Sequence, residues 1–310
     1  MKKLGKIMGI TVLIILSVIL LFFAGVFINN KIQLKNEAKK IMPIENFVEI
    51  DGKKLSYKVS RKGDKIIVLL PGYMTASPII DFKPLTDELE KDYQVVTIEP
   101  LGYGLSDDTD KKRSVENLTE EVHKVVEAEG LKNYILMGHS IFGVYSLNYI
   151  QTYPDEVEAF VGIDSSIPAQ SGADDNQEGT ISLLSKSGLF RLLSSASPDM
   201  LGTPAGIDAE LQTQYKYLAL RNIGSNATMN EAKIMPENFE KTKNMTYPKE
   251  LPVLYLLASE STDSDPNWLS IHEEMVKESK KAEIKTLEGT HYLHHTKAKE
   301  ITTETKKFLD

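Results

Sequence analysis

Short apolar runs alternate with amphipathic stretches from residue 66 to about 164, and again from about 251 to the C-terminus. The first run, Ile66–Leu70, is apolar throughout and stops at Pro71-Gly72, as expected of a strand that is buried on both faces. Between such runs, apolar residues recur at helical spacing. This alternation predicts an α/β fold with a mostly parallel sheet that is covered by helices on both sides.

The elements of this predicted fold can be placed along the chain. Asp51-Gly52 separates two alternating runs, which favours a β-hairpin over 47–59. The later strands are predicted at Gln94–Ile98, Tyr134–Met137, Ala159–Ile163, Val253–Leu257 and Glu283–Leu287. The helices are predicted at Phe82–Leu89, Val115–Glu129, Val144–Gln151, Trp268–Lys280 and Ala298–Leu309.

The N-terminus carries a run long enough to cross a membrane. Ile7–Ile28 has no charged residue, and a helix of about 20 residues spans the hydrocarbon core of a bilayer. Lys2, Lys3 and Lys6 precede the run, which favours a cytoplasmic N-terminus and an extracytoplasmic domain, although Lys31 and Lys35 reduce this asymmetry. The alternative is a cleaved signal peptide and a secreted domain. An anchor is favoured, because the run is long and lacks a small-x-small cleavage site.

Charge and composition exclude several functions. Residues 1–36 carry five Lys and no acid, so the rest has a net charge of −13, against −8 for the whole chain. No polybasic stretch stands out in that acidic part, and nucleic-acid binding is not expected. The chain has no Cys, which excludes disulfides, thiolate metal sites and a Cys nucleophile.

One turn combines a nucleophile with close-packing glycines. Ser140 falls where the predicted strand Tyr134–Met137 meets the helix that starts at Val144, and Gly138 and Gly143 flank it. A tight strand-to-helix turn lifts a nucleophile clear of the sheet and directs the next backbone N–H at a developing oxyanion. The alternative is that Ser140 merely occupies a tight turn.

The segments around this turn resemble α/β-hydrolases from about residue 45 to the end. Gly138–Gly143 resembles the nucleophile elbow, and Leu70–Tyr73 resembles the oxyanion loop. Gly102–Ser106 is similar to the G-x-G-x-S turn of that family, and Leu287–Tyr292 to the segment that delivers its catalytic His. The resemblance implies the α/β-hydrolase fold, with a helical cap inserted between the sixth and seventh strands.

The resemblance also divides the chain. We expect an anchor over 1–31, a tether over 32–45, core over 46–164 and 251–310, and a cap over 165–250. One departure concerns the elbow, where the usual second glycine of G-x-S-x-G is Phe142 and Gly143 comes one residue later. The bulk of Phe142 must then be accommodated against a neighbouring strand or helix.

Of the six His, His291 is predicted to be the general base, because it directly follows the last strand and Gly289. His139 lies inside the elbow, and His123 and His272 fall on predicted helices. His294 and His295 share a face with His291 if the loop is helical, which suggests a metal site. Among nearby acids only Glu288 suits that set, so we expect neither a metal nor a cofactor.

Three acids compete to orient His291. The family usually places its acid after the strand that follows the cap, where Ser261 occupies the expected position. Glu260, one residue earlier, is our first choice. Asp263, two residues later, is the second, although an N-cap role suits it equally. Asp164, after the preceding strand, is the third and is an alternative position known in the family.

The predicted reaction is acyl transfer. The resemblance implies that Ser140 attacks an ester, thioester or amide carbonyl, with His291 as base and the backbone N–H groups of Tyr73 and Ile141 as the oxyanion hole. An apolar cap favours an apolar small-molecule substrate. One alternative is a prolyl-type aminopeptidase, which needs an acidic pair in the cap; the other is a non-catalytic binding protein of the same fold. The cap acids are Asp174, Asp175, Glu178, Glu210, Glu231 and Glu237.

Overall fold

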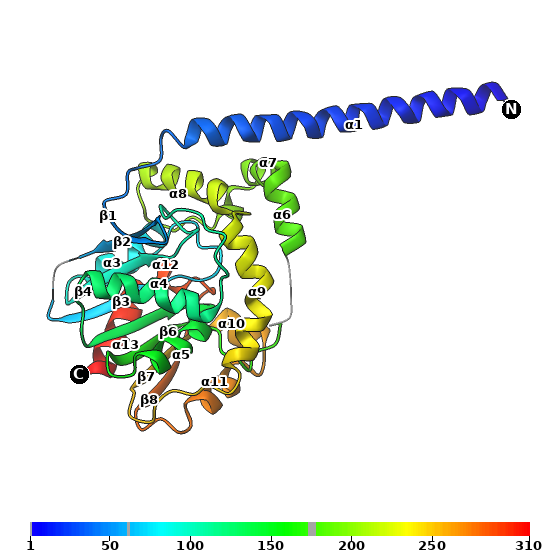
Figure 1. Ribbon diagram of the computed structural model, residues 1–310. Helices are drawn as coiled ribbons and strands as arrows, with labels where there is room; N and C mark the ends of the chain where they lie inside the picture. The colour runs from blue at the N-terminus through cyan, green and yellow to red at the C-terminus, as the bar shows by residue number, and fades with distance from the viewer. Residues whose placement is uncertain (1, 61–62, 173–177) are drawn as a thin grey trace.

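A single eight-stranded sheet organises the protein. The computed structural model describes residues 2–60, 63–172 and 178–310 (Figure 1). The strands are β1 (Asn46–Ile50), β2 (Lys53–Val59), β3 (Lys65–Leu70), β4 (Tyr93–Glu99), β5 (Tyr134–His139), β6 (Val157–Ile163), β7 (Val253–Ala258) and β8 (Ala282–Leu287). Their order is β1-β2-β4-β3-β5-β6-β7-β8; β2 pairs antiparallel with both β1 and β4, and all other pairs are parallel. The predicted α/β-hydrolase fold is confirmed.

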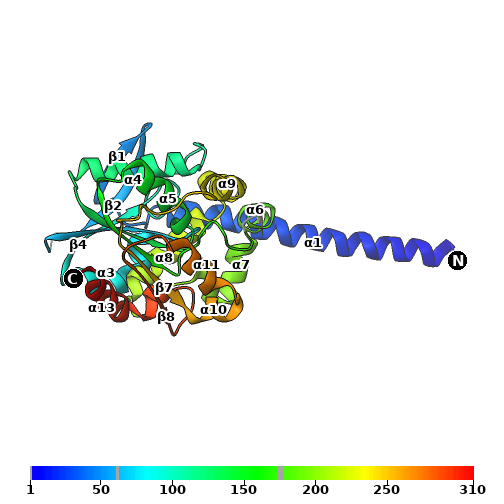
Figure 2. The same cartoon turned by 90° about the horizontal axis from the view of Figure 1, so that it is seen from below.

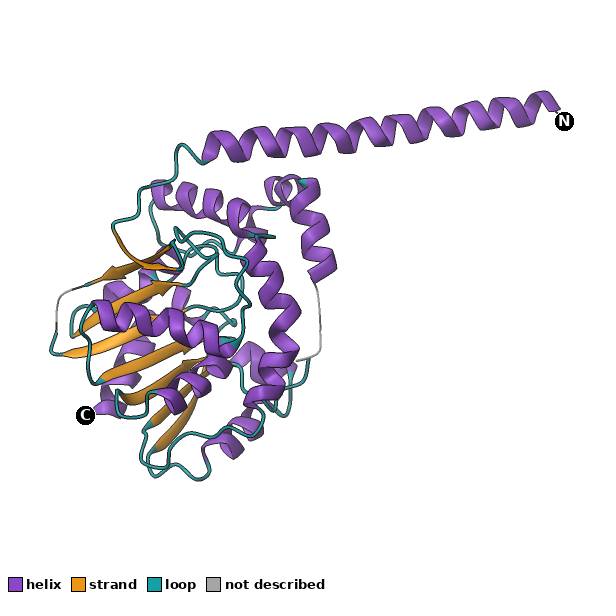
Figure 3. Cartoon of the chain, in the orientation of Figure 1, coloured by secondary structure: helices purple, strands orange, loops and turns teal. Residues whose placement is uncertain are grey.

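Helices cover both faces of this sheet, because its central strands are apolar on both sides (Figures 2 and 3). In β3, Val68 and Leu70 belong to one apolar cluster, while Ile67 and Leu69 belong to another. The first cluster is completed by α4 (Val115–Ala128), α5 (Phe142–Thr152) and α11 (Trp268–Val276), and the second by α3 (Lys83–Leu89) and α13 (Ala298–Leu309). The short helices are α2 (Pro78–Asp81), α10 (Ser259–Ser264) and α12 (Leu293–Thr296).

The segment between β6 and β7 folds into helices that lie over the carboxyl ends of the strands (Figure 1). They are α6 (Glu178–Ser187), α7 (Leu189–Ala196), the 3₁₀ helix η1 (Pro198–Leu201), α8 (Ala209–Asn222) and α9 (Asn226–Thr242). We call this segment the cap. Its α8 buries Tyr215 and Leu218 against Ile80 and Leu105 of the core. The cap therefore packs on the sheet domain through a separate apolar interface.

The N-terminal helix α1 (Lys2–Glu37) is longer than the predicted anchor. Its most apolar window has a mean hydropathy of 3.0 and is uncovered by the rest of the described chain, which marks it as a candidate membrane span. The predicted tether over 32–45 begins as helix, because Glu37 is held in place. Its carboxylate accepts two hydrogen bonds of 2.6 Å from Arg191 of α7.

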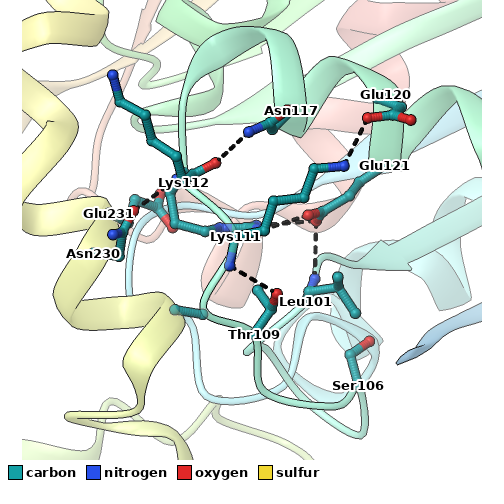
Figure 4. Close-up of polar contacts among 12 residues, drawn as sticks. Leu101, Ser106, Thr109, Lys111, Lys112, Asn117, Glu120, Glu121, Asn230 and Glu231 are labelled. Atoms are coloured by element: carbon teal, nitrogen blue, oxygen red, sulfur yellow. Dashed lines mark hydrogen bonds and ion pairs between the residues drawn. The ribbon is translucent and has the colours of Figure 1, made fainter. Parts of the chain in front are cut away.

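A buried ion pair fixes the loop between β4 and α4 (Figure 4). Arg113 and Glu121 are both fully buried, and Arg113 Nη2 donates to Glu121 Oε2 over 3.0 Å. The same carboxylate oxygen accepts from the backbone N–H of Leu101, and Asn230 of the cap accepts from the N–H of Arg113. The pair thus ties the turn at 102–106 to α4 and α9.

We expect Arg113→Met to lower the free energy of unfolding by about 3–5 kcal/mol, because it leaves the Glu121 carboxylate buried without its cation. The neighbouring Lys112 pairs with Glu237 in solvent, so Lys112→Met should cost less than about 1 kcal/mol. Chemical denaturation of the detergent-solubilised full-length protein measures both values. Equal losses would contradict the structural role of the pair.

Candidate active site

Ser140 occupies a strained turn at the carboxyl end of β5. Its φ of 53° lies in the left-handed region, which is uncommon for a residue with a side chain. Three backbone hydrogen bonds hold it there. Its N–H donates to Ile163 over 3.3 Å, and its carbonyl accepts from Gly143 over 3.0 Å and from Ser166 over 2.7 Å. The turn has the conformation expected of a nucleophile elbow.

Two glycines permit this packing. A Cβ at Gly143 would lie 2.2 Å from the carbonyl oxygen of Ser166, so the segment after β6 could not approach the elbow. A Cβ at Gly72 would lie 2.9 Å from the Cβ of Ser140. Phe142, which stands where a glycine is usual, is buried and packs its Cβ over Gly138. Its bulk is thus accommodated, and the required glycine is Gly143.

The topology brings the oxyanion loop to the elbow. The strand β3 lies between β4 and β5, and Leu70 pairs with Gly138. The chain leaves β3 in one direction and returns to its other side as β5, so the carboxyl ends of these two strands form the crevice where α/β sheets bind ligands. The backbone N–H groups of Tyr73 and Ile141 donate to no partner among the described residues, so both are free to donate to a ligand.

Asp164 holds the imidazole of His291. Its Oδ2 lies 2.6 Å from His291 Nδ1, and because a carboxylate only accepts, the ring nitrogen carries the hydrogen. Three more groups donate to this fully buried carboxylate: the backbone N–H of Ala258 (3.0 Å), the Trp268 indole (3.2 Å) and the Ser261 hydroxyl (2.5 Å). The imidazole is therefore fixed in one tautomer and one orientation.

This contact reverses the predicted order of the three acids. Glu260, the first choice, accepts from the backbone N–H of His291 over 2.8 Å rather than from its ring. Asp263 lies on the short helix α10, and no hydrogen bond or ion pair joins it to His291 in the described part of the chain. Ser261, in the position where the family usually has its acid, donates instead to Asp164. A polar residue with positive φ directly after β6, matching Ser140 after β5, is the feature that distinguishes Asp164.

A pocket of about 170 Å³ lies between the sheet domain and the cap. Tyr73 and Tyr292, which are neighbours of the oxyanion loop glycine and of His291, line it from the core. Phe190, Met200 and Tyr215 line it from the cap. The volume is below the roughly 300–1,000 Å³ of most small-molecule sites, so the pocket suits one apolar part of a ligand.

His139, at the end of β5, contacts the backbone of His291. It is buried, its Nε2 donates to the carbonyl of His291 over 3.0 Å, and its Nδ1 has no partner among the described residues. Burial lowers the pKa of His139 well below its usual range, and the nearby His294 and His291 act in the same direction. His139 therefore stays neutral. His123 stacks on Tyr153 far from the site, as its helical position suggested.

The three histidines near the C-terminus contact two different acids, because His291 contacts Asp164 and the other two do not. His294 and His295 contact Asp81 of α2 rather than Glu288, with Nε2 atoms 2.7 and 2.9 Å from its two oxygens. Tyr215 of the cap donates to the same carboxylate. The ligand atoms of Asp81, His294 and His295 lie within 4.8 Å of one another, so this set has the chemistry to hold a divalent cation. As hydrogen-bonded groups, they anchor α12 and thus the loop of His291.

The acids of the cap do not form a free pair in the described part of the chain. Glu231 is buried, and the hydroxyls of Tyr103 and Tyr145 donate to its two oxygens over 2.8 and 3.0 Å. Burial raises the pKa of Glu231. Glu237 pairs with Lys112 on the surface, and Asp174 and Asp175 lie outside the described residues.

We expect His139 to make the protein less stable in acid. An unfolded His has a pKa of about 6.5, so below that pH the unfolded chain binds a proton that folded His139 does not. As the pH is lowered from 6.5 to 5, the free energy of unfolding of the parent should fall. In His139→Gln this fall should be smaller by about 1.36 kcal/mol per pH unit. Denaturation of the detergent-solubilised protein at each pH gives the slopes, and identical slopes would show that His139 titrates normally.

Comparisons with known proteins agree with the fold. A model of the α/β hydrolase fold matches residues 65–187. The uncharacterised protein YbdG of Bacillus subtilis is 28% identical over 307 residues, which is 95% of this chain and 94% of YbdG. The human serine hydrolase BPHL is 30% identical over 118 residues, covering 37% of this chain and 40% of BPHL.

Among solved structures, a thermophilic esterase from Thermogutta terrifontis superposes with a TM-score of 0.65 at 15% identity, over 85% of this chain and 96% of the esterase. At this identity the likeness shows the fold alone. The family model, the relatives and the observed topology together identify the chain as an enzyme of the hydrolase class with the α/β-hydrolase fold.

Proposed function

We propose that the protein is a membrane-anchored serine hydrolase that cleaves a carboxylic ester, or a thioester or amide, through an acyl-enzyme on Ser140. The observation that carries this proposal is the 2.6 Å contact between Asp164 and His291 next to the strained Ser140 turn. A nucleophile on an elbow, a base on the last loop and a buried acid that orients the base are the parts of a catalytic triad.

The steps follow from this geometry. Ser140 Oγ attacks the carbonyl carbon while His291 Nε2 takes its proton, and the N–H groups of Tyr73 and Ile141 stabilise the oxyanion. When the intermediate collapses, the bond to the leaving group breaks and His291 returns the proton to it. Water then attacks the acyl-enzyme, with His291 again as base, and releases the acid and free Ser140.

The surroundings of Asp164 suit its role. Its carboxylate stabilises the imidazolium that forms in each step, and the N–H and O–H groups of Ala258, Ser261 and Trp268 hold it in place beforehand. Such preorganised groups need no rearrangement during the reaction. The name of the human serine hydrolase supports the same chemistry here. The aminopeptidase alternative lacks support, because Glu231 is already bound by two tyrosines.

The anchor completes the proposal. The helix α1 carries the uncharged run 7–28 and exposes nearly all of it, and Lys2, Lys3 and Lys6 precede it. The positive-inside rule then puts the N-terminus in the cytoplasm and the catalytic domain on the other side of the membrane.

We expect a fluorophosphonate probe to label the parent protein and not Ser140→Ala, because only an activated serine reacts with it. Gel fluorescence of the probe measures the labelling. Ser166→Ala, in the segment that follows β6, is the control and should still be labelled. A parent that stays unlabelled, or a Ser140→Ala variant that is labelled, would refute Ser140 as the nucleophile.

The acid can be identified by kinetics. Asp164→Asn should lower kcat by up to about 10⁴, because an amide can donate to Nδ1 and favour the wrong tautomer, as in the corresponding change in a serine protease. Glu260→Gln keeps an oxygen that can accept from the His291 backbone, so it should retain near-parental activity. Both are compared on a chromogenic short-chain ester, with circular dichroism to verify folding.

The pattern of losses decides between the acids. A large loss in Glu260→Gln with an active Asp164→Asn would restore the order expected from the sequence. Asp263→Asn, on the surface of α10, should behave as the parent.

A further inference from the structure

Exposed apolar side chains of the globular part gather on the cap. Outside α1, large exposed apolar residues are few among the described residues, and more than half of them lie on three consecutive elements, α6, α7 and η1. These are Leu183, Leu192, Leu193 and Met200. Because α7 packs against both α6 and η1, they belong to one end of the cap. A concentration of this kind marks a surface that is covered by something apolar.

The candidate membrane span passes directly beside that end (Figures 1 and 2). Gly188, between α6 and α7, lies so close to α1 that an added Cβ would be 3.0 Å from the carbonyl oxygen of Val26 and 2.7 Å from the Cβ of Asn30. Val26 belongs to the last turns of the apolar run 7–28. If this run crosses the roughly 30 Å hydrocarbon core, the turn at Gly188 lies at the depth of the bilayer surface.

A buried ion pair fixes this position. The two terminal nitrogens of Arg191, Nη1 and Nη2, donate to the Glu37 carboxylate over 2.6 Å, and Arg191 Nε donates to Asn30 Oδ1 over 2.8 Å. All three residues are buried. Since Arg191 is on α7 and its partners are on α1, the cap cannot turn about the anchor without breaking a desolvated pair, which is costly.

The pocket beside the candidate active site reaches the same end. Phe190, which precedes Arg191, and Met200 line it from the cap, and Tyr73 and Tyr292 line it from the core. Met200 is also 47% exposed, so it lies where the pocket meets the apolar surface. The pocket wall and the exposed end of the cap are therefore continuous.

We propose that the end of the cap formed by Leu183, Leu192, Leu193 and Met200 docks on the bilayer, held there by Arg191 and Glu37, and that the pocket receives the acyl ester of a bilayer lipid. The substrate class rests on the proposed function, whereas the docking does not. Lys31 and Lys35 of α1 and Lys186 of α6 lie near the same level and favour an anionic bilayer.

The chain has no Cys, so single cysteine variants can be labelled uniquely with a polarity-sensitive fluorophore. The full-length protein carrying Leu193→Cys or Phe47→Cys is reconstituted in vesicles of phosphatidylcholine and phosphatidylglycerol. The two side chains are exposed to the same degree, 42% and 41%, but Phe47 is on β1, at the other end of the molecule from α6 (Figure 1).

The label at 193 should shift to shorter wavelength in vesicles and be quenched by lipids that carry a spin label, while the label at 47 should not. Equal, water-like spectra at both positions would overturn the docking. Arg191→Glu should reduce the shift at 193, and adding Glu37→Arg should restore it.

Lipid delivery is tested by two substrates. Leu192→Glu with Leu193→Glu should lower hydrolysis of a long-chain fluorogenic ester in the vesicles by about tenfold or more, since two apolar side chains lose their burial. Hydrolysis of a soluble short-chain ester should stay unchanged, and Phe47→Glu should affect neither. Delivery from the bilayer would be overturned if this double variant lost activity equally on both esters, or if it lost activity on neither. A parent that is inactive on both esters would refute the proposed function, while the fluorescence would still decide the docking.

Discussion

The carboxylate of Asp164 connects four separate segments of the candidate site. It accepts hydrogen bonds from the end of β7, from α10, from the start of α11 and from the loop of His291. A buried carboxylate is stable only when it is fully hydrogen-bonded, so these four segments must close around it together. Their closure places His291 at the carboxyl end of β5, where His139 of the elbow donates to its carbonyl.

A second carboxylate acts on the same loop from the other side. Asp81 receives His294 and His295 from α12 and Tyr215 from the cap. Desolvation opposes its charge, but the two histidines lower its pKa well below the usual range. The loop of His291 is thus held at both ends, by Asp164 through the ring and by Asp81 through the following turn. Tyr215 makes the position of the cap part of that arrangement.

The sheet, its helices and the turn at Ser140 could be predicted from the sequence, because apolar runs, spacing and flanking glycines are local signals. Tyr134–Met137 and Val253–Leu257 fall within the observed β5 and β7. The acid could not be chosen in the same way. Glu260 and Asp164 both follow strands, and only the path of the loop after β7 decides which carboxylate reaches the ring. That loop folds into α10, which turns Glu260 toward a backbone N–H.

The ion pair between Arg191 and Glu37 has a consequence for work on the isolated domain. A protein shortened to begin after residue 37 would leave Arg191 of α7 with neither Glu37 to neutralise it nor Asn30 to bind it. The helix that carries Phe190 would then lose its fixed neighbour, and the wall of the pocket would be free to shift. The helix α1 is in this sense part of the structure that holds the cap, and a truncated form would report the properties of an altered cap.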